Sequence, residues 1–354
     1  MEEKKDTLGM LDLVIRPGFC VKENQIIKVN QAAESLFITP GTDVRPLLLT
    51  GSEEYAAFTG GCLYLTLNLS SHSCGASVTR VDDIDVFLLE QESDNGELRS
   101  MALAAREPRE PLTNVMITAD SLFPLCAAES SPRTAEQVAR LNRGLFQILR
   151  IIGNMSDAER CAAVSHQETV DIPALFAEFF EKAETLVSHT GITLTYEGPD
   201  QPIYGLADRE QLERAVLNIL SNAIKFTPKG GTVTAKLTRS GRMLRLSVTD
   251  SGSGIAQSVR SSVFSRYLRQ PALEDSRYGI GLGMVLIRTA AAHHGGAVLI
   301  DQPEGVGTRI TMTMSIRQSK QATLRSNVLR VDYAGERDHG LIELSECLPT
   351  ELYE

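Results

Sequence analysis

The stretch LNILSNAIKFTP, residues 217–228, decides the fold of this chain of 354 residues. Asn218, Asn222 and Lys225 are spaced i, i+4 and i+7, so they share one face of the amphipathic helix that the apolar pattern predicts over 208–226. Carboxamide oxygens can bind a hard cation such as Mg²⁺, and a lysine one turn further on can meet phosphate as a point charge. Taken alone, the same face is also typical of a solvated helix surface.

A second segment, DSGSGI at 250–255, follows directly on the predicted strand LRLSVT. Asp250 ends that strand, where a carboxylate can accept a hydrogen bond from an amino group such as that of adenine. Gly252 and Gly254 allow the backbone to turn tightly and to approach a ligand closely. A simple turn after a strand gives the same pattern, because such turns are common.

A third segment, YGIGLG at 278–283, precedes a predicted helix over 283–294. Glycines before a helix N-terminus expose N–H donors to phosphate, and the helix dipole favours the negative charge. The spacing of Gly279, Gly281 and Gly283 is weak by itself, and no βαβ unit follows that would make it a dinucleotide fingerprint. The segment GVGT at 305–308 adds a further glycine turn between two predicted strands.

In order and spacing, these segments closely resemble the ATP-binding domain of sensor histidine kinases, which gyrase-type and chaperone ATPases share. The resemblance implies an α/β sandwich at 163–316 that binds ATP and Mg²⁺, with Asn222 as the magnesium ligand and 256–278 as a lid. It also assigns to the nucleotide the residues Asn218, Lys225, Phe226, Asp250, Gly252, Gly254, Ile255, Gly279, Gly281, Leu282, Gly283 and Thr308.

Residues 93–162 show two apolar stripes with spacings of three and four, which predict an antiparallel helical hairpin. Each stripe is long enough to require more than one partner helix, so a dimeric four-helix bundle is expected. The stripes consist of Met101, Ala105, Pro108, Leu112, Val115, Ala119 and Leu122, and of Val138, Leu141, Leu145, Ile148, Ile152 and Met155.

The first stripe contains AAREPREPLTN, residues 104–114, which resembles the acceptor segment S-H-E-L-R-T-P-L of sensor histidine kinases. Glu107 matches the acidic residue of that segment, but Arg106 stands at the position of the acceptor histidine. A guanidinium stays protonated at neutral pH and offers no nucleophilic nitrogen, so Arg106 is expected to be inactive. None of the six histidines lies within 93–162. Pro108 is additional to the family pattern and predicts a bend or break.

Two further regions complete the expected α+β multidomain architecture. Residues 1–92 weakly resemble a PAS sensor domain through the stretch FCVKENQIIKVNQAAESLF, and no ligand can be named for it. Residues 317–354 form a C-terminal extension whose apolar clusters VLRVDY and LIELSECL argue against a free linker. The expected domains are therefore 1–92, 93–162, 163–316 and 317–354.

The composition narrows the class of protein. A net charge of −10 and a pI of about 5.3 argue against a general nucleic-acid-binding role. Six dispersed cysteines without a C-x-x-C pair argue against a zinc or redox site. Neither a signal peptide nor an apolar run long enough to span a membrane is visible, so a cytoplasmic location is expected.

Three functional interpretations remain open. In the first, the chain binds ATP and Mg²⁺ but acts as a regulatory pseudokinase, forming a homodimer or heterodimer through the hairpin and modulating a response regulator or partner kinase. In the second, it is an active kinase with a non-standard acceptor. In the third, it is a non-enzymatic module whose conformation depends on ATP. Whether the chain is an enzyme is left undecided by the sequence.

Overall fold

The structure is a computed structural model. It describes residues 9, 11–69, 72–90, 100–101, 103–105, 108, 111–119, 121–122, 132–163, 167–255, 263–264, 282–303, 307–317 and 338–353. None of the helices in these ranges is both long and apolar enough to cross a bilayer.

The N-terminal region is an antiparallel sheet in the strand order β2-β1-β5-β4-β3. Its strands are β1 (Gly18–Lys22), β2 (Gln25–Val29), β3 (Cys62–Asn68), β4 (Ser73–Val81) and β5 (Ile84–Leu89), and its short helices are η1 (Leu11–Leu13), α2 (Gln31–Glu34), η2 (Arg45–Leu47) and α3 (Ser52–Ala56). Phe19 and Phe87 stack at 4.7 Å in its core. The assignment of this region as a PAS domain stays a prediction.

The helical region contains α5 (Pro132–Ala163), and residues 111–119 are also helical. The buried face differs in part from the predicted stripes. Pro108, which is described as helical, is exposed, and Val115, Leu122, Leu141 and Ile148 are also exposed. The buried apolar positions are Ala105, Leu112, Met116 and Ala119 in the first stretch, and Ala139, Leu145, Phe146, Leu149 and Ile152 on α5. A straight helix drifts from a strict seven-residue repeat, which moves the buried face away from the predicted one.

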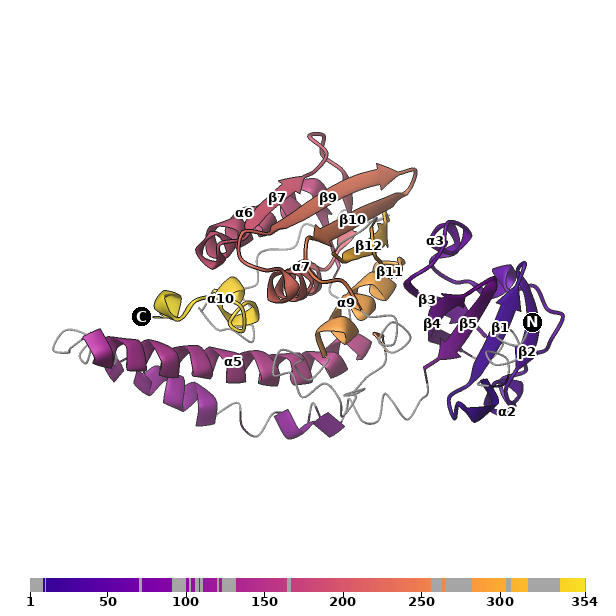
Figure 1. Ribbon diagram of the computed structural model, residues 1–354, viewed down its shortest axis with the longest axis horizontal. Coiled ribbons are helices and arrows are strands. Elements are labelled where there is room, and N and C mark those ends of the chain that lie inside the picture. Colours follow the sequence, from indigo (N-terminus) through magenta and orange to yellow (C-terminus); the bar gives the residue numbers. More distant parts are fainter. Residues whose placement is uncertain are drawn as a thin grey trace.

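The C-terminal half contains a second layered unit, in which helices pack on a mixed sheet of order β11-β12-β10-β9-β7. Figure 1 shows α7 and α9 between this sheet and the long helix α5. Its elements are β6 (Glu168–Asp171), α6 (Ile172–Val187), η3 (Ser188–Thr190), β7 (Thr193–Glu197), β8 (Tyr204–Ala207), α7 (Arg209–Phe226), β9 (Thr232–Ser240), β10 (Met243–Asp250), α9 (Leu282–His293), β11 (Val298–Asp301) and β12 (Arg309–Ser315). The predicted α+β multidomain fold is confirmed.

The start, the buried face and the end of helix α7 follow from its local sequence. Asp208 is the N-cap, and its side chain accepts a hydrogen bond from the backbone N–H of Gln211 at 3.2 Å. Leu212, Ile219 and Ala223 belong to the face that is buried against the sheet and α9. Pro228 follows the C-cap residue Thr227 and cannot continue the helix.

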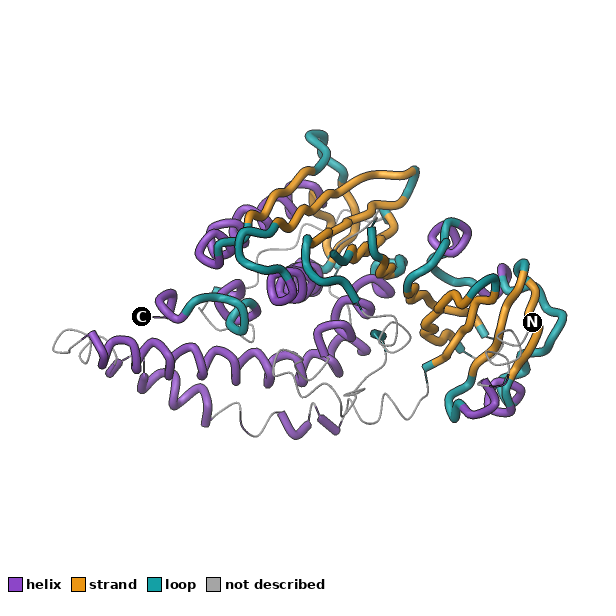
Figure 2. Tube along the Cα trace, viewed as in Figure 1, coloured by secondary structure: helices purple, strands orange, loops and turns teal. Residues whose placement is uncertain are grey.

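The two sheets join, which the sequence did not predict. Strand β3 pairs with β11 in antiparallel register, with Tyr64 opposite Val298, so ten strands form one continuous sheet. Figure 2 shows the strands of the two regions meeting at this edge. The buried Arg288 of α9 reinforces the joint, because it pairs with Glu90 at 2.5 Å and lies 5.0 Å from the ring centroid of Tyr64.

The C-terminal segment, residues 338–353, packs between α5 and α7 rather than extending away (Figure 1). It contains α10 (His339–Glu343) and η4 (Thr350–Tyr353). Its apolar residues Ile342, Leu344 and Leu348 are buried in the same core as α6 and α7. The segment is thus part of the folded unit that holds the candidate site.

Candidate functional site

Helix α7 places Asn218 at the centre of a buried polar region. Its Nδ2 donates to the backbone carbonyl of Arg214 at 2.9 Å and to Oε2 of Glu343 at 3.4 Å. Its Oδ1 is buried and accepts no hydrogen bond from the residues that the structure describes. A buried carbonyl oxygen without a donor is costly, so it marks a place where a polar ligand or ion would be favourable.

Helix α9 begins against that same side chain. A Cβ atom on Gly283 would lie 2.7 Å from Oδ1 of Asn218, so glycine is what lets the N-terminus of α9 approach α7 this closely. Leu282 instead packs with Val285 against Met101 and Met155 of the helical region. The structure therefore brings Gly283 to the site and gives Leu282 a packing role.

The turn after β10 reaches the other end of α7. The Oδ1 atom of Asp250 accepts hydrogen bonds from the N–H of Gly252 at 2.8 Å and of Thr308 at 3.1 Å, and these hold the carboxylate in place. Its Oδ2 atom accepts none from the described residues. Burial raises the pKa of Asp250 above its ordinary value, although the two backbone hydrogen bonds oppose that rise. Asp250 is thus an oriented and largely buried acceptor.

Close glycine contacts fix this turn against α7 and β12. A Cβ atom on Gly252 would lie 2.4 Å from the carbonyl oxygen of Phe226, at the C-terminal end of α7. Gly254 and Gly307 have φ values of +74° and +93°, in the region that favours glycine. Ile255 is partly buried and packs against the core. Gly252 of the second predicted segment and Gly283 of the third therefore both lie against α7, which the first segment forms.

Asn222 and its surroundings fit a bound nucleotide with a hard cation. Its carboxamide is half-buried, and no hydrogen bond or ion pair to the described residues engages it. It lies one helical turn after Asn218 on α7, whose Oδ1 atom likewise accepts no hydrogen bond from the described residues. Oxygen donors suit Mg²⁺, and a fixed carboxylate suits an amino group, so the residues present are chemically compatible with ATP and Mg²⁺.

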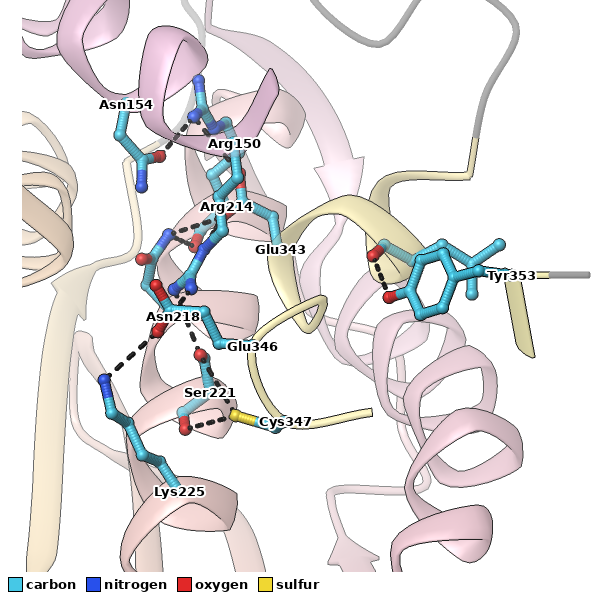
Figure 3. A network of polar contacts seen from close by, with 11 residues as sticks. Arg150, Asn154, Arg214, Asn218, Ser221, Lys225, Glu343, Glu346, Cys347 and Tyr353 are labelled. Carbon is cyan, nitrogen blue, oxygen red and sulfur yellow. Dashed lines mark hydrogen bonds and ion pairs between the residues drawn. The ribbon is translucent and has the colours of Figure 1, made fainter. Parts of the chain in front are cut away.

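Lys225 forms an ion pair with Glu346, which the sequence did not predict. Its Nζ atom lies 3.1 Å from Oε2 of Glu346 in the C-terminal segment, and only 13% of its side chain is exposed. The same carboxylate oxygen lies 3.0 Å from Nη1 of Arg150 on α5. Glu346 is therefore held between cations from two different helices, as Figure 3 shows.

Glu343 supplies a second carboxylate beside Glu346. We call the group of five side chains formed here the charge cluster: Arg150, Arg214, Lys225, Glu343 and Glu346. The Glu343 side chain is fully buried, and its two oxygens lie 3.3 Å from Arg150 and 3.2 Å from Arg214. Burial alone would raise the pKa of Glu346, but the charges and hydrogen bonds of Arg150 and Lys225 outweigh it and hold that pKa below its ordinary value. Glu346 is consequently a carboxylate at neutral pH.

Several predicted positions lie outside the described residues. These are Arg106, Glu107, Gly279, Gly281 and, apart from two residues, the predicted lid at 256–278. Of the lid, Val263 and Phe264 are described, and the Phe264 ring lies 5.6 Å from that of Tyr64 in the N-terminal sheet.

The described histidines near this region have structural partners. His294 is buried, where its Nε2 accepts from the N–H of Asp208 and its Nδ1 donates to the carbonyl of Ala290 at 2.7 Å. Burial lowers its pKa, which keeps the ring neutral. His293 contacts Gln211 and His339 contacts Glu213.

Comparisons with known proteins agree with this geometry. Residues 207–318 match the family described as Histidine kinase-, DNA gyrase B-, and HSP90-like ATPase. An uncharacterized sensor-like histidine kinase of Rhizobium meliloti (strain 1021) is 28% identical over 276 residues, which are 73% of this chain and 52% of the relative. The adaptive-response sensory kinase SasA of Synechocystis sp. is 28% identical over 264 residues, which are 70% of this chain and 68% of the relative.

A solved structure shares the fold. Full-length ShkA in complex with AMPPNP superposes with a TM-score of 0.51 at 24% identity, over 62% of this chain and 46% of that chain. The chain spans about half the length of the Rhizobium meliloti relative. The match over 207–318 contains α7, the turn after β10 and the start of α9, which are the elements that form the candidate site. Residues 207–318 therefore form a histidine-kinase-type ATPase domain, in a chain of α+β multidomain architecture that is similar to sensor histidine kinases.

Proposed function

We propose that this chain is a signalling protein that binds ATP and Mg²⁺ along α7 and acts as a regulatory pseudokinase. Asn222 would hold the cation, Asp250 would accept from the adenine amino group, and Lys225 would meet phosphate. The observation that carries the proposal is the close approach of Gly252 and Gly283, from two separate glycine motifs, to the asparagine-bearing helix α7, with the carbonyl oxygen of Asn218 left without a hydrogen bond among the described residues.

Autophosphorylation at the usual place is not expected. Arg106 stands where the family resemblance puts the acceptor histidine, and a guanidinium has no nucleophilic nitrogen at neutral pH. The region 93–162 contains no histidine that could substitute for it. His293, His294 and His339 are held in hydrogen bonds on the ATPase side, which supports structural roles for them.

Such a protein would act by binding a partner protein rather than by transferring a phosphoryl group. Exposed apolar side chains remain on both helical stretches, and they include Val115, Ile117 and Leu122 on the first and Leu141 and Ile148 on the second. Apolar stripes of this kind are covered when helical hairpins pair. We propose a homodimer or heterodimer through the helical region, with a response regulator or a partner kinase as the molecule that is regulated.

Incubation with ATP labelled at the γ-phosphate separates this function from that of an active kinase. The expected result is ATP binding without label on the chain. Asn222→Ala is the matched control, because any label that persists without the magnesium ligand comes from a contaminating kinase. Acid-labile, base-stable label that appears on the wild-type chain and disappears in Asn222→Ala would show an active histidine kinase with another acceptor. Absence of nucleotide binding would contradict the proposal in all its forms.

A further inference from the structure

The C-terminal segment follows the face of α7 that carries the candidate phosphate-binding lysine. Four residues on this face, spaced four, three and four apart, contact the segment: Arg214, Asn218, Ser221 and Lys225. Arg214 and Asn218 meet Glu343, the backbone carbonyl of Ser221 accepts from the Cys347 thiol at 3.4 Å, and Lys225 meets Glu346 (Figure 3).

The segment is also attached to α5, by main-chain and aromatic contacts in addition to the ion pairs of Glu343 and Glu346 with Arg150. Arg143 donates to the backbone carbonyls of Ser345 at 2.8 Å and of Glu346 at 3.0 Å. The rings of Phe146 and Tyr353 pack edge to face at 5.2 Å. Main-chain and aromatic contacts thus hold the segment on α5, while its two carboxylates face cations on both helices, Arg150 on α5 and Arg214 and Lys225 on α7.

We propose that the C-terminal segment is an autoinhibitory element, in which the Glu346 carboxylate occupies the phosphate position of Lys225 and is displaced by ATP and Mg²⁺. This inference rests on the proposed nucleotide-binding function. Without the segment, Arg150, Arg214 and Lys225 would present three cationic side chains along α5 and α7, and such a face attracts a polyanion such as triphosphate. A carboxylate on the same lysine competes with phosphate for the same charge.

The two carboxylates differ in a way that indicates where release begins. The side chain of Glu346 is 31% exposed, whereas that of Glu343 is fully buried. Solvent and ligand can therefore reach Glu346 first, while Glu343 keeps the start of the segment in place. Cys347 follows directly, and burial raises the pKa of its thiol, so it should react slowly while the segment is docked.

Calorimetric titration of the full chain with ATP and Mg²⁺ tests the competition. Couplings between sites usually change affinity by about 5- to 150-fold, so Glu346→Gln should lower the Kd at least about fivefold relative to wild type. Glu351→Gln is the matched control, because Glu351 belongs to the same segment and is exposed. Binding by all three proteins with equal Kd would overturn the autoinhibition while leaving the proposed nucleotide binding intact. No binding by any of them would refute the proposed function itself.

Alkylation of the wild-type chain by iodoacetamide, read out for each cysteine by mass spectrometry, gives a test that needs no variant. ATP and Mg²⁺ at a concentration that saturates the calorimetric signal should accelerate modification of Cys347 at least about fivefold, in line with typical couplings. Cys20 is the internal control, because it is buried in the N-terminal sheet and burial raises its pKa to about 11. An unchanged rate at Cys347 under saturating nucleotide would show that the segment stays docked and would overturn the inference.

Discussion

Replacing Glu343 by glutamine should destabilise the ATPase unit strongly, because the change removes the buried carboxylate that pairs with Arg214 and that Arg150 shares with Glu346. The Glu343 side chain is fully buried, and those of Arg150 and Arg214 are only 9% and 4% exposed. Breaking a buried ion pair by removing one partner costs about 3–5 kcal/mol. Glutamine keeps the volume and one acceptor oxygen, so the expected loss of unfolding free energy comes from the missing charge rather than from a cavity.

Thermal unfolding followed by circular dichroism measures this loss. A unit of this size loses about 2–4 °C per kcal/mol, so the transition temperature should fall by roughly 6–20 °C. The matched control is Glu136→Gln, which removes the pair between Glu136 and Arg140, whose side chains are 59% and 69% exposed. Exposed pairs of this kind contribute about 0.3–0.5 kcal/mol, so the control should barely change. A Glu343→Gln transition within about 2 °C of the control would refute the view that this carboxylate neutralises buried arginines.

Three further outcomes are expected. Gly283→Ala should lower the free energy of unfolding, measured by urea titration, by up to about 2 kcal/mol, because the alanine Cβ would lie 2.7 Å from Oδ1 of Asn218. Alanine is the better helix former, so a gain in stability would contradict the close contact. Because burial raises the pKa of Asp250, its protonation should weaken ATP binding at a less acidic pH than for an ordinary aspartate. Calorimetry across a range of pH should show this loss of affinity in the wild type and not in Asp250→Asn. A wild-type affinity that does not change with pH would exclude Asp250 from the site. Arg288→Gln should speed hydrogen exchange of the paired amides in β3 and β11, since it breaks the ion pair with Glu90; unchanged protection would mean that strand pairing alone joins the two regions.

Much of the fold was predictable because local signals and global packing agree in the C-terminal half. The apolar period, the Asp208 cap and the following Pro228 all indicate the same helix, and α7 spans Arg209–Phe226. Alternating residues on either side of Gly241 are typical of a hairpin, and β9 and β10 form one there. The family resemblance was confirmed over 207–318, whereas the roles of the individual site residues stay predictions.

The remaining features depend on long-range contacts that leave little local trace. The pairing of β3 with β11 joins strands that are far apart in the sequence, and β3 resembles any other largely buried strand. The charge cluster combines Arg150, Arg214 and Glu343 from three separate segments, and each looks like an ordinary surface charge when its own segment is read alone. One signal was available: Arg214, Asn218, Ser221 and Lys225 form a continuous polar stripe on α7, which indicates a polar partner on that face.

Calorimetry of the wild-type chain and of Asn222→Ala with ATP, in the presence and absence of Mg²⁺, tests whether α7 binds the nucleotide and the magnesium ion. We expect binding of ATP that strengthens with Mg²⁺ in the wild type and loses that dependence in Asn222→Ala, because the carboxamide of Asn222 would supply the cation with an oxygen ligand. Equal affinities in the two proteins at every Mg²⁺ concentration would contradict the assignment of α7 as the nucleotide- and magnesium-binding helix.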